Sequence, residues 1–276
     1  LEAARKVGAT GFLPRTTPEE CLVDNAAAHL LHTVGTRVPL SRTFHRVAKA
    51  NGVSLPQGLF AGLTADLNLI ASAPHLLPRW LEMPDGHQVV GPVYANLPGE
   101  VPEFVTDLAA GPKPLVYFAV GSSGNRELVL DVLRGLGRAD CQVLAPVRSH
   151  LHQEDLETLP LNIHVTDWIP THQLGDAVDL AITHGGEGTV QTSCVQGWPF
   201  IGIPLQLEQR FNVQRCVAFG SARLVSQKEA RRADWAALVR EALADDVMRS
   251  RARRVAELMK GLDGPGQAAE AICKLL

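Results

Sequence analysis

The chain has 276 residues, of which 46% are hydrophobic and 20% are charged, and its formal net charge at pH 7 is -3. This composition is typical of a globular protein, and it offers no basic surface for nucleic acid. The 5 cysteines are spread without a C-x-x-C pair, which favours reduced thiols over disulfides or a zinc site. No apolar run approaches the roughly 18 residues of a membrane helix, and no signal peptide opens the chain. We therefore expect a cytoplasmic protein without membrane insertion.

Residues 1–110 carry weak patterns. Hydrophobic spacing and breakers predict helices over 26–34 and 41–50 and short strands over 66–72 and 89–93. Prolines and glycines gather in residues 95–114, which indicates a linker between domains.

The remainder of the chain is more regular. Continuous apolar runs predict five strands, over 115–120, 141–146, 162–165, 178–183 and 199–203. Helical patterns separate these runs and continue to the end of the chain, over 234–244, 247–259 and 266–275. Buried strands that alternate with helices indicate a parallel sheet covered on both faces. The predicted fold class is therefore α/β with a Rossmann-type parallel sheet.

The most informative stretch is Thr183-His184-Gly185-Gly186-Glu187-Gly188-Thr189, which joins an apolar run to a predicted helix. Strand, glycine turn and helix together present unpaired backbone N–H groups and a positive helix end to an anion. Glycine allows the backbone to close on a phosphate, because a side chain would stand in the way. Taken alone, the stretch is equally compatible with a plain glycine-rich connection and a structural histidine.

Three further pieces lie on either side of this turn. Trp168 ends a short apolar run before Pro170, and it would either stack on a nucleobase or fill a core or interface position. Glu208 and Gln209 begin a predicted helix, where they would hydrogen-bond sugar hydroxyls or form a solvated first turn. Gly121-Ser122 follows the strand predicted over 115–120, which is a generic glycine turn when considered by itself.

In chain order, W-x-P, H-G-G-x-G-T, G-x-P and E-Q-x-x-N resemble the donor-sugar signature of nucleotide-sugar-dependent glycosyltransferases with the GT-B fold. The resemblance is to the branch that glycosylates lipophilic small molecules. It covers residues 111–276 well and about 40–110 loosely. It implies a nucleotide-sugar donor-binding domain over 111–276, and a partial acceptor-side domain with a linker over 1–110.

The resemblance also implies roles for individual residues. It assigns the donor diphosphate to Ser122, His184, Gly186, Gly188 and Thr189, the nucleobase to Trp168 and the backbone of Ile169, and the transferred sugar to Glu208 and Gln209. Asn212 is expected to order its turn. Glu187 is expected to face solvent or a sugar hydroxyl, because a carboxylate would repel a diphosphate. Thr192 stands where the family often has a ribose-binding glutamate, which leaves both UDP and TDP open.

The implied reaction is inverting, metal-independent transfer of a hexose from a UDP- or TDP-sugar to a hydroxyl of a small-molecule acceptor. The chain has no Asp-x-Asp pair to hold a divalent ion, so no metal or other cofactor is expected, and the helix end would stabilise the leaving diphosphate. Inversion needs a general base. In the family this is a histidine near the start of the first domain, and neither His29, His32 nor His45 follows an opening strand, so the base stays unassigned.

Two alternatives remain open. The first is a non-catalytic nucleotide-sugar-binding subunit that requires a partner supplying the missing N-terminal half, and a homodimer is also possible. The second, weaker alternative is a nucleotide-sugar epimerase on the same fold, which would need acidic residues around the anomeric carbon.

Overall fold

The computed structural model describes residues 39–55, 65–77, 83, 85–94, 96 and 98–275. The helix predicted over 26–34 lies outside these residues. The chain divides into two compact units, one made of Leu1–Gly91 with Asp263–Leu276 and the other of Pro92–Leu262. The predicted domain boundary between residues 110 and 111 stays a prediction.

The described part of the first unit consists of short elements. They are α3 (Arg42–Ala50), β1 (Asn68–Ile70), the 3₁₀ turn η2 (Pro74–Leu76), β2 (His87–Val89) and α12 (Gly264–Cys273), and β1 pairs with β2 in parallel. The strand predicted over 89–93 is wrong in position, because β2 ends where that strand was to begin. Gly91 has a φ of 97°, and the next residue, Pro92, has no N–H to donate, so the ladder stops there.

The second unit is built on a six-stranded sheet. Its strands are β3 (Leu115–Ala119), β4 (Gln142–Ala145), β5 (Ile163–Val165), β6 (Leu180–Thr183), β7 (Phe200–Gly202) and β8 (Ala222–Leu224). All neighbours are parallel, in the order β5-β4-β3-β6-β7-β8. All five predicted strands of this region are present. The sixth, β8, was not predicted, because its three residues include a polar arginine and give no apolar run.

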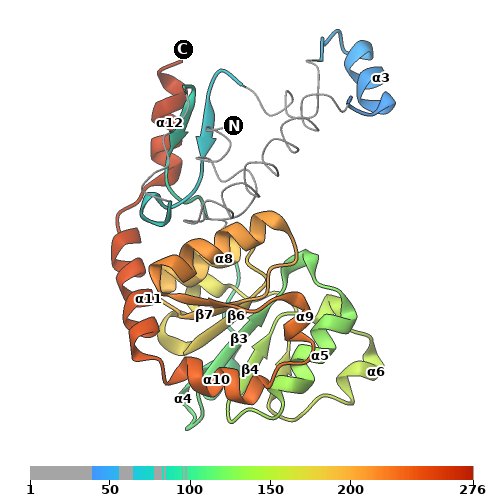
Figure 1. The fold of residues 1–276 in the computed structure, drawn as a ribbon, viewed down its shortest axis with the longest axis vertical. Helices are drawn as coiled ribbons and strands as arrows, with labels where there is room; N and C mark the ends of the chain where they lie inside the picture. Colours follow the sequence, from blue (N-terminus) through green and yellow to red (C-terminus); the bar gives the residue numbers. More distant parts are fainter. Residues whose placement is uncertain are drawn as a thin grey trace, which may run out of the picture. The chain divides into compact units, whose positions relative to one another are not determined.

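Helices flank this sheet (Figure 1). They are α4 (Glu103–Ala110), α5 (Arg126–Leu136), α6 (Gln153–Leu156), α7 (Glu187–Gln196), α8 (Leu207–Phe219), α9 (Gln227–Ala230), α10 (Trp235–Leu243) and α11 (Asp246–Met259). The described connections that follow β3, β4 and β5 contain the 3₁₀ turns η3 (Gly121–Ser123), η4 (Arg148–His150), η5 (Thr171–Gln173) and η6 (Gly175–Ala177). Helix α4 lies within the stretch predicted as linker. Among the described residues, no helix combines the length and apolar character needed to span a membrane.

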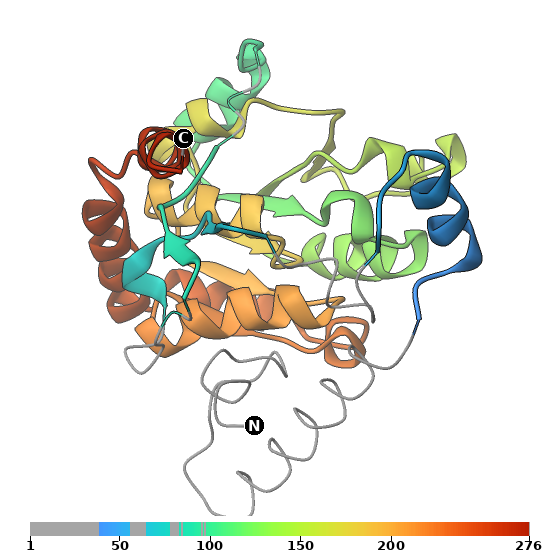
Figure 2. The ribbon, with the colours of Figure 1, turned by 90° about the horizontal axis from the view of Figure 1, so that it is seen from above.

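The two faces of the sheet are packed by different helices. Val116 and Phe118 of β3 belong to the same core cluster as α5 and α10, and α5 approaches α10 so closely that a β-carbon added at Gly135 would stand 2.4 Å from the Trp235 ring. Tyr117 points to the other face, with its ring centroid 5.8 Å from that of Trp198. On that side α11 lies beside α7 (Figure 2). Alternating side chains of one buried strand thus fill both layers.

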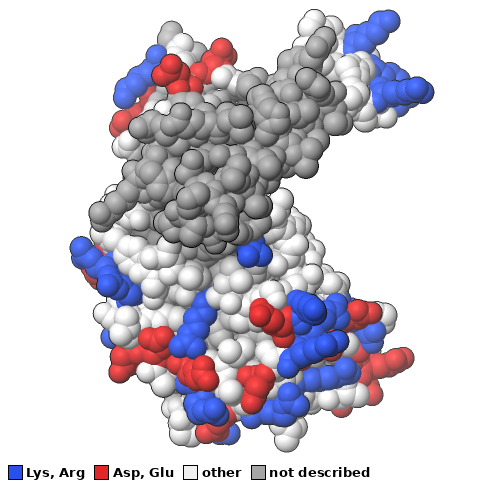
Figure 3. Space-filling model, viewed as in Figure 1, with Lys and Arg blue, Asp and Glu red and all other residues white. Residues whose placement is uncertain are grey.

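Charged side chains of both signs are interspersed over the described face of this unit that Figure 3 shows. Several form ion pairs between helices, such as Arg231 with Glu127 and Asp131 at 3.4 and 3.2 Å. Exposed pairs of this kind contribute little to stability.

The strand order places a topological switch point between β3 and β6. From β3 the chain continues to β4 on one side, while β6 begins the run to β7 on the other. In open parallel sheets, ligands bind at the carboxyl ends of the two strands that flank such a point. Gly121-Ser122 follows β3 and His184-Gly185-Gly186 follows β6, so both predicted glycine turns lie at this edge.

Candidate functional site

A cavity of about 940 Å³ opens at this edge of the sheet. Its walls come from the loops that follow β3, β4 and β5, from one side of α7, and from the segment that precedes α4. Of the residues singled out in the sequence, it is lined by Ser122, Trp168, Ile169, Gly188, Thr189 and Thr192. His184, Gly186, Glu208 and Gln209 do not line it. The fold therefore brings the nucleobase candidates together with part of the diphosphate candidates.

Close packing leaves no room for a side chain at Gly185 or Gly186 in the glycine turn that leads into α7. Gly185 has a φ of 87°, and a β-carbon there would stand 2.6 Å from Val213 and 2.7 Å from the carbonyl oxygen of Gln209. Gly186 is the N-cap residue, and no side chain caps this helix end in the described part of the chain. The first-turn N–H groups therefore lack the usual side-chain acceptor. At Gly188 an added β-carbon would meet no atom within 4 Å, so the backbone is open to the cavity there.

The Thr189 hydroxyl is already engaged by its own turn. It accepts a hydrogen bond from the Thr183 hydroxyl at 2.8 Å and donates one to the Gly186 carbonyl at 2.9 Å. Its single proton is thereby used, so it would have to rotate before donating to an anion. The backbone N–H groups are better placed as donors than this hydroxyl.

The His184 ring is buried between two glycines. It is 7% exposed, and a β-carbon would stand 2.8 Å from its Cε1 if added at Gly121 and 2.5 Å from its Nε2 if added at Gly186. Its Nδ1 is buried without a hydrogen-bond partner in the described part of the chain. Burial lowers the pKa of His184, because a charged imidazolium is disfavoured away from water. The ring therefore connects the two glycine turns as a neutral group.

Trp168 and Ile169 line the cavity from the loop that follows β5. The Trp168 side chain is 52% exposed and Ile169 is 2% exposed. Gly99 lies against the tryptophan ring, since a β-carbon there would stand 3.2 Å from Cζ3. An indole that is half exposed at a cavity mouth has a face available for stacking. A fully buried core tryptophan, such as Trp198 at 3%, does not.

The two predicted sugar-binding residues point in different directions. Gln209 is 3% exposed; its Oε1 accepts from the Leu205 N–H at 2.9 Å and its Nε2 donates to the Ser123 hydroxyl at 3.1 Å. Glu208 is exposed and accepts from the Asn212 amide. The amide of Gln209 thus ties α8 to the turn after β3. The sugar-binding assignment of both residues stays a prediction.

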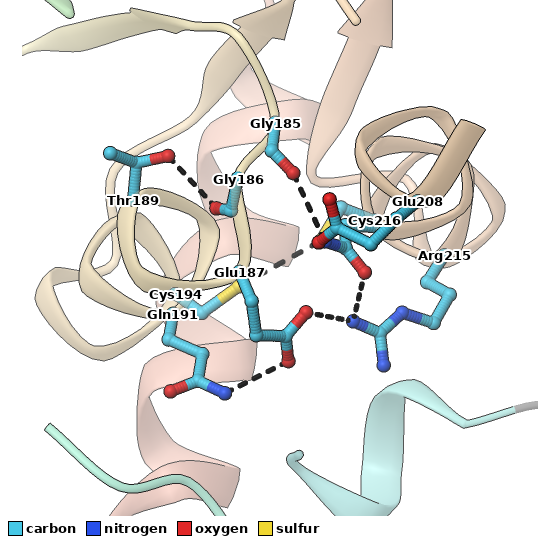
Figure 4. A network of polar contacts seen from close by, with 10 residues as sticks. Gly185, Gly186, Glu187, Thr189, Gln191, Cys194, Glu208, Arg215 and Cys216 are labelled. Atoms are coloured by element: carbon cyan, nitrogen blue, oxygen red, sulfur yellow. Dashed lines mark hydrogen bonds and ion pairs between the residues drawn. The ribbon is translucent and has the colours of Figure 1, made fainter. Parts of the chain in front are cut away.

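Glu187 faces solvent in part, as expected, since 34% of its side chain is exposed, and it does not line the cavity. Its carboxylate also accepts hydrogen bonds from Arg215 and Gln191, each at 2.8 Å, which the sequence did not predict (Figure 4). A contact between Glu187 and a sugar hydroxyl stays a prediction. Arg215 lies on α8 and was not singled out in the sequence, since it is 28 residues away. Asn212, as expected, orders the turn by donating to the Gly185 carbonyl at 3.1 Å.

Several cavity residues were missed in the sequence, namely Tyr94, Asn96, Tyr117, Arg148, His172 and Gln196. Arg148 is the notable one, because it places a cation at the cavity. Its guanidinium donates to the Leu151 carbonyl at 3.2 Å and to Gln153 at 2.9 Å. The sequence did contain a signal for Arg148, because it is a basic residue that closely follows the apolar run of β4. In the described residues no group of three or more His, Cys, Asp or Glu could hold a metal ion.

Residues 130–275 match a family model described as the C-terminal domain of Erythromycin biosynthesis protein CIII-like proteins. The chain belongs to this family. Its curated relatives include a PGL/p-HBAD biosynthesis glycosyltransferase of Mycobacterium tuberculosis, 29% identical over 192 residues, which are 70% of this chain and 44% of that protein. Another is 4'-demethylrebeccamycin synthase of Lentzea aerocolonigenes, 30% identical over 236 residues, covering 80% of this chain and 53% of the relative.

The solved glycosyltransferase VinC, in complex with DTDP, superposes with a TM-score of 0.63 at 17% identity, over 92% of this chain and 63% of VinC. This Erythromycin biosynthesis protein CIII-like chain therefore has a GT-B-type α/β fold, and the predicted family and fold class are confirmed. Relatives that it matches are named as glycosyltransferases, and one of them, avaP of Aspergillus versicolor, is named as a UDP-glucosyltransferase. The chain spans about half the length of the curated relatives it matches.

Proposed function

We propose that this chain carries the donor site of an inverting, metal-independent glycosyltransferase that moves a hexose from a UDP- or TDP-sugar to a hydroxyl of a small molecule. The proposed acceptor class follows the relatives, which are named for PGL/p-HBAD biosynthesis and for 4'-demethylrebeccamycin. The observation that carries the proposal is the cavity at the switch point, which both the open start of α7 and Trp168 line.

The proposed binding mode places the nucleobase against Trp168 and the diphosphate at the first turn of α7. The helix end carries a partial positive charge and N–H groups without a side-chain cap. Ser122 lies on the cavity wall after β3 and is a further donor. As the glycosidic bond to the diphosphate breaks, charge accumulates on the leaving group. Fixed donors stabilise that charge without a divalent ion.

The wall formed by α7 favours TDP over UDP. Thr192 lines the cavity and its hydroxyl donates to the Gly188 carbonyl at 2.9 Å, so it offers a ribose only a lone pair. Glu187, the carboxylate at the start of this helix, is held by Arg215. The two adjacent hydroxyls of a ribose therefore find no carboxylate on α7, and a 2'-deoxyribose requires none.

Calorimetric titration of the chain with UDP, TDP and their glucose esters tests the proposal. We expect binding that survives chelation by EDTA, that is unchanged by added Mg²⁺, and that is weakened by Trp168→Ala and by His184→Ala. Leu161→Ala is the matched control, because that side chain is 99% exposed and lies away from the cavity. If none of the four ligands binds, the glycine turn has only a structural role and the proposed donor site is wrong.

Transfer is tested separately with TDP-glucose and small phenolic or hydroxylated acceptors, and the anomeric configuration of any glycoside is read by NMR. An α-linked donor should give a β-linked product. Retained configuration would contradict the inverting mechanism. Donor binding without transfer, restored by adding an N-terminal half from a relative, would support the non-catalytic subunit instead.

A further inference from the structure

Glu187 is the first residue of α7, the helix proposed to receive the donor diphosphate. An acidic side chain in a first helical turn is attracted to the N–H groups and the positive dipole of that turn. Here the same N–H groups are those proposed for the diphosphate. A carboxylate that turned back onto them would compete with the ligand and repel it.

Two hydrogen-bond donors hold this carboxylate away from the cavity. Arg215 Nη2 donates to Glu187 Oε2 at 2.8 Å and Gln191 Nε2 donates to Glu187 Oε1 at 2.8 Å. Figure 4 shows the carboxylate between Arg215, which reaches it from α8, and Gln191, which reaches it from α7 itself. Each carboxylate oxygen therefore has a partner that points it away from the cavity. Glu187 accordingly does not line that cavity.

Arg215 is itself fixed in place. Its side chain is 3% exposed, its Nη2 also donates to Asn212 Oδ1 at 2.9 Å, and its guanidinium lies 5.0 Å from the centre of the Phe211 ring. The Asn212 amide in turn donates to the Gly185 carbonyl and to Glu208. One buried cation thus connects α8 to both sides of the glycine turn.

We propose that Arg215 is a positioning residue of the donor site, which keeps the start of α7 open to a diphosphate by holding the Glu187 carboxylate away from it. The inference rests on the proposed function. Retaining a buried arginine here is otherwise hard to explain, because removing its charge from water costs about as much as its attraction to one carboxylate returns, and the Glu187 side chain is 34% exposed. The proposed role supplies the reason, because Arg215 both keeps a carboxylate off the anion site and places a positive charge near it.

Arg215→Gln tests the proposal. We expect UDP and TDP to bind about tenfold more weakly, which corresponds to about 1.4 kcal/mol, while uridine and thymidine bind as before, because only the diphosphate meets the carboxylate. A purely structural effect would lower the affinity for nucleosides as well. Arg223→Gln is the matched control, since Arg223 also links elements of this unit through an ion pair, at 2.9 Å to Asp245, but that partner is not at the start of α7.

The double variant Glu187→Gln/Arg215→Gln separates charge from packing. Removing the carboxylate should return the affinity for UDP and TDP to within about twofold of the wild type, since no charge remains to repel the ligand. Glu187→Gln alone keeps the cation and should bind both nucleotides more tightly. This single variant also serves if Arg215→Gln fails to fold, which thermal unfolding would reveal.

The outcomes distinguish this inference from the proposed function. Wild-type chain that binds neither UDP nor TDP overturns both. If the wild type binds UDP and TDP, three results would each overturn the role of Arg215 and leave the proposed function standing. They are an unchanged nucleotide affinity in Arg215→Gln, a loss of affinity that persists in the double variant, and weaker nucleotide binding by Glu187→Gln.

Discussion

The imidazole of His184 lies against the backbone of Gly121, so that a β-carbon added at Gly121 would stand 2.8 Å from Cε1 and 2.9 Å from Nε2. These residues follow different strands, β6 and β3, which are neighbours at the switch point. The histidine side chain therefore fixes the spacing of the two glycine turns. Only a residue without a side chain leaves room for it.

Gly121→Ala should destabilise the second unit and displace the His184 ring. The φ of 54° at Gly121 alone costs an L-residue about 1–2 kcal/mol, and the collision with the ring adds to that cost. Gly175→Ala is the matched control, because its φ is 50° and an added β-carbon meets nothing within 4 Å. Urea unfolding should show a larger loss for Gly121→Ala. Equal losses of unfolding free energy in the two variants would mean that the His184 ring moves aside at little cost.

Gly188→Ala should weaken the binding of nucleotides without harming the fold. The added methyl meets no protein atom within 4 Å, and alanine in a helix is favoured over glycine by about 0.5–1 kcal/mol. The same methyl would occupy space proposed for the diphosphate. Calorimetry should therefore find weaker UDP and TDP binding with unchanged nucleoside binding, and thermal unfolding should find equal or greater stability. Full nucleotide affinity in a stable variant would place the diphosphate elsewhere.

Trp168→Ala should weaken nucleosides and nucleotides by the same factor, in contrast to Gly188→Ala. Stacking of a base on an aromatic ring is worth about 1–3 kcal/mol, and the side chain is already 52% exposed, so we expect the free energy of unfolding to change by less than about 0.5 kcal/mol. Binding of uridine, thymidine, UDP and TDP is the measurement. A loss confined to the diphosphates would argue against stacking.

The sequence was sufficient for the elements whose patterns are local. The apolar run 115–120 contains β3 (Leu115–Ala119), and the helical pattern that separates it from the run 141–146 is α5 (Arg126–Leu136). Both have a continuous apolar pattern and a clear start, with Asn125 capping α5 through its side chain at 2.9 Å. Strand β8, by contrast, exists because β7 offers it an edge, and that depends on the tertiary structure.

The candidate site was predictable in its backbone but not in its side chains. The glycine turns and Trp168 have fixed chain order and recognisable types, so their position at one sheet edge followed from the fold class. The orientation of Glu187 did not, because it depends on Arg215, a residue of the next helix. Gln209 was similarly unpredictable, since its partner Ser123 is 86 residues away.

His184 should make stability depend on pH in the range just below neutrality. Burial lowers the pKa of His184 and of His164 in the native state, whereas in the unfolded chain both titrate near 6.5. As the pH falls through about 6.5 the unfolded state takes up protons first, so the free energy of unfolding falls; above that pH the contribution is fully present.

Each such histidine can contribute a slope of up to about 1.4 kcal/mol per pH unit. His184→Gln should therefore flatten the fall of unfolding free energy between about pH 7 and 5.5, and His164→Gln should flatten it by a similar mechanism at a site away from the cavity. Urea unfolding at several pH values gives the slopes. An unchanged slope in His184→Gln would mean that the native ring is protonated as readily as the unfolded one.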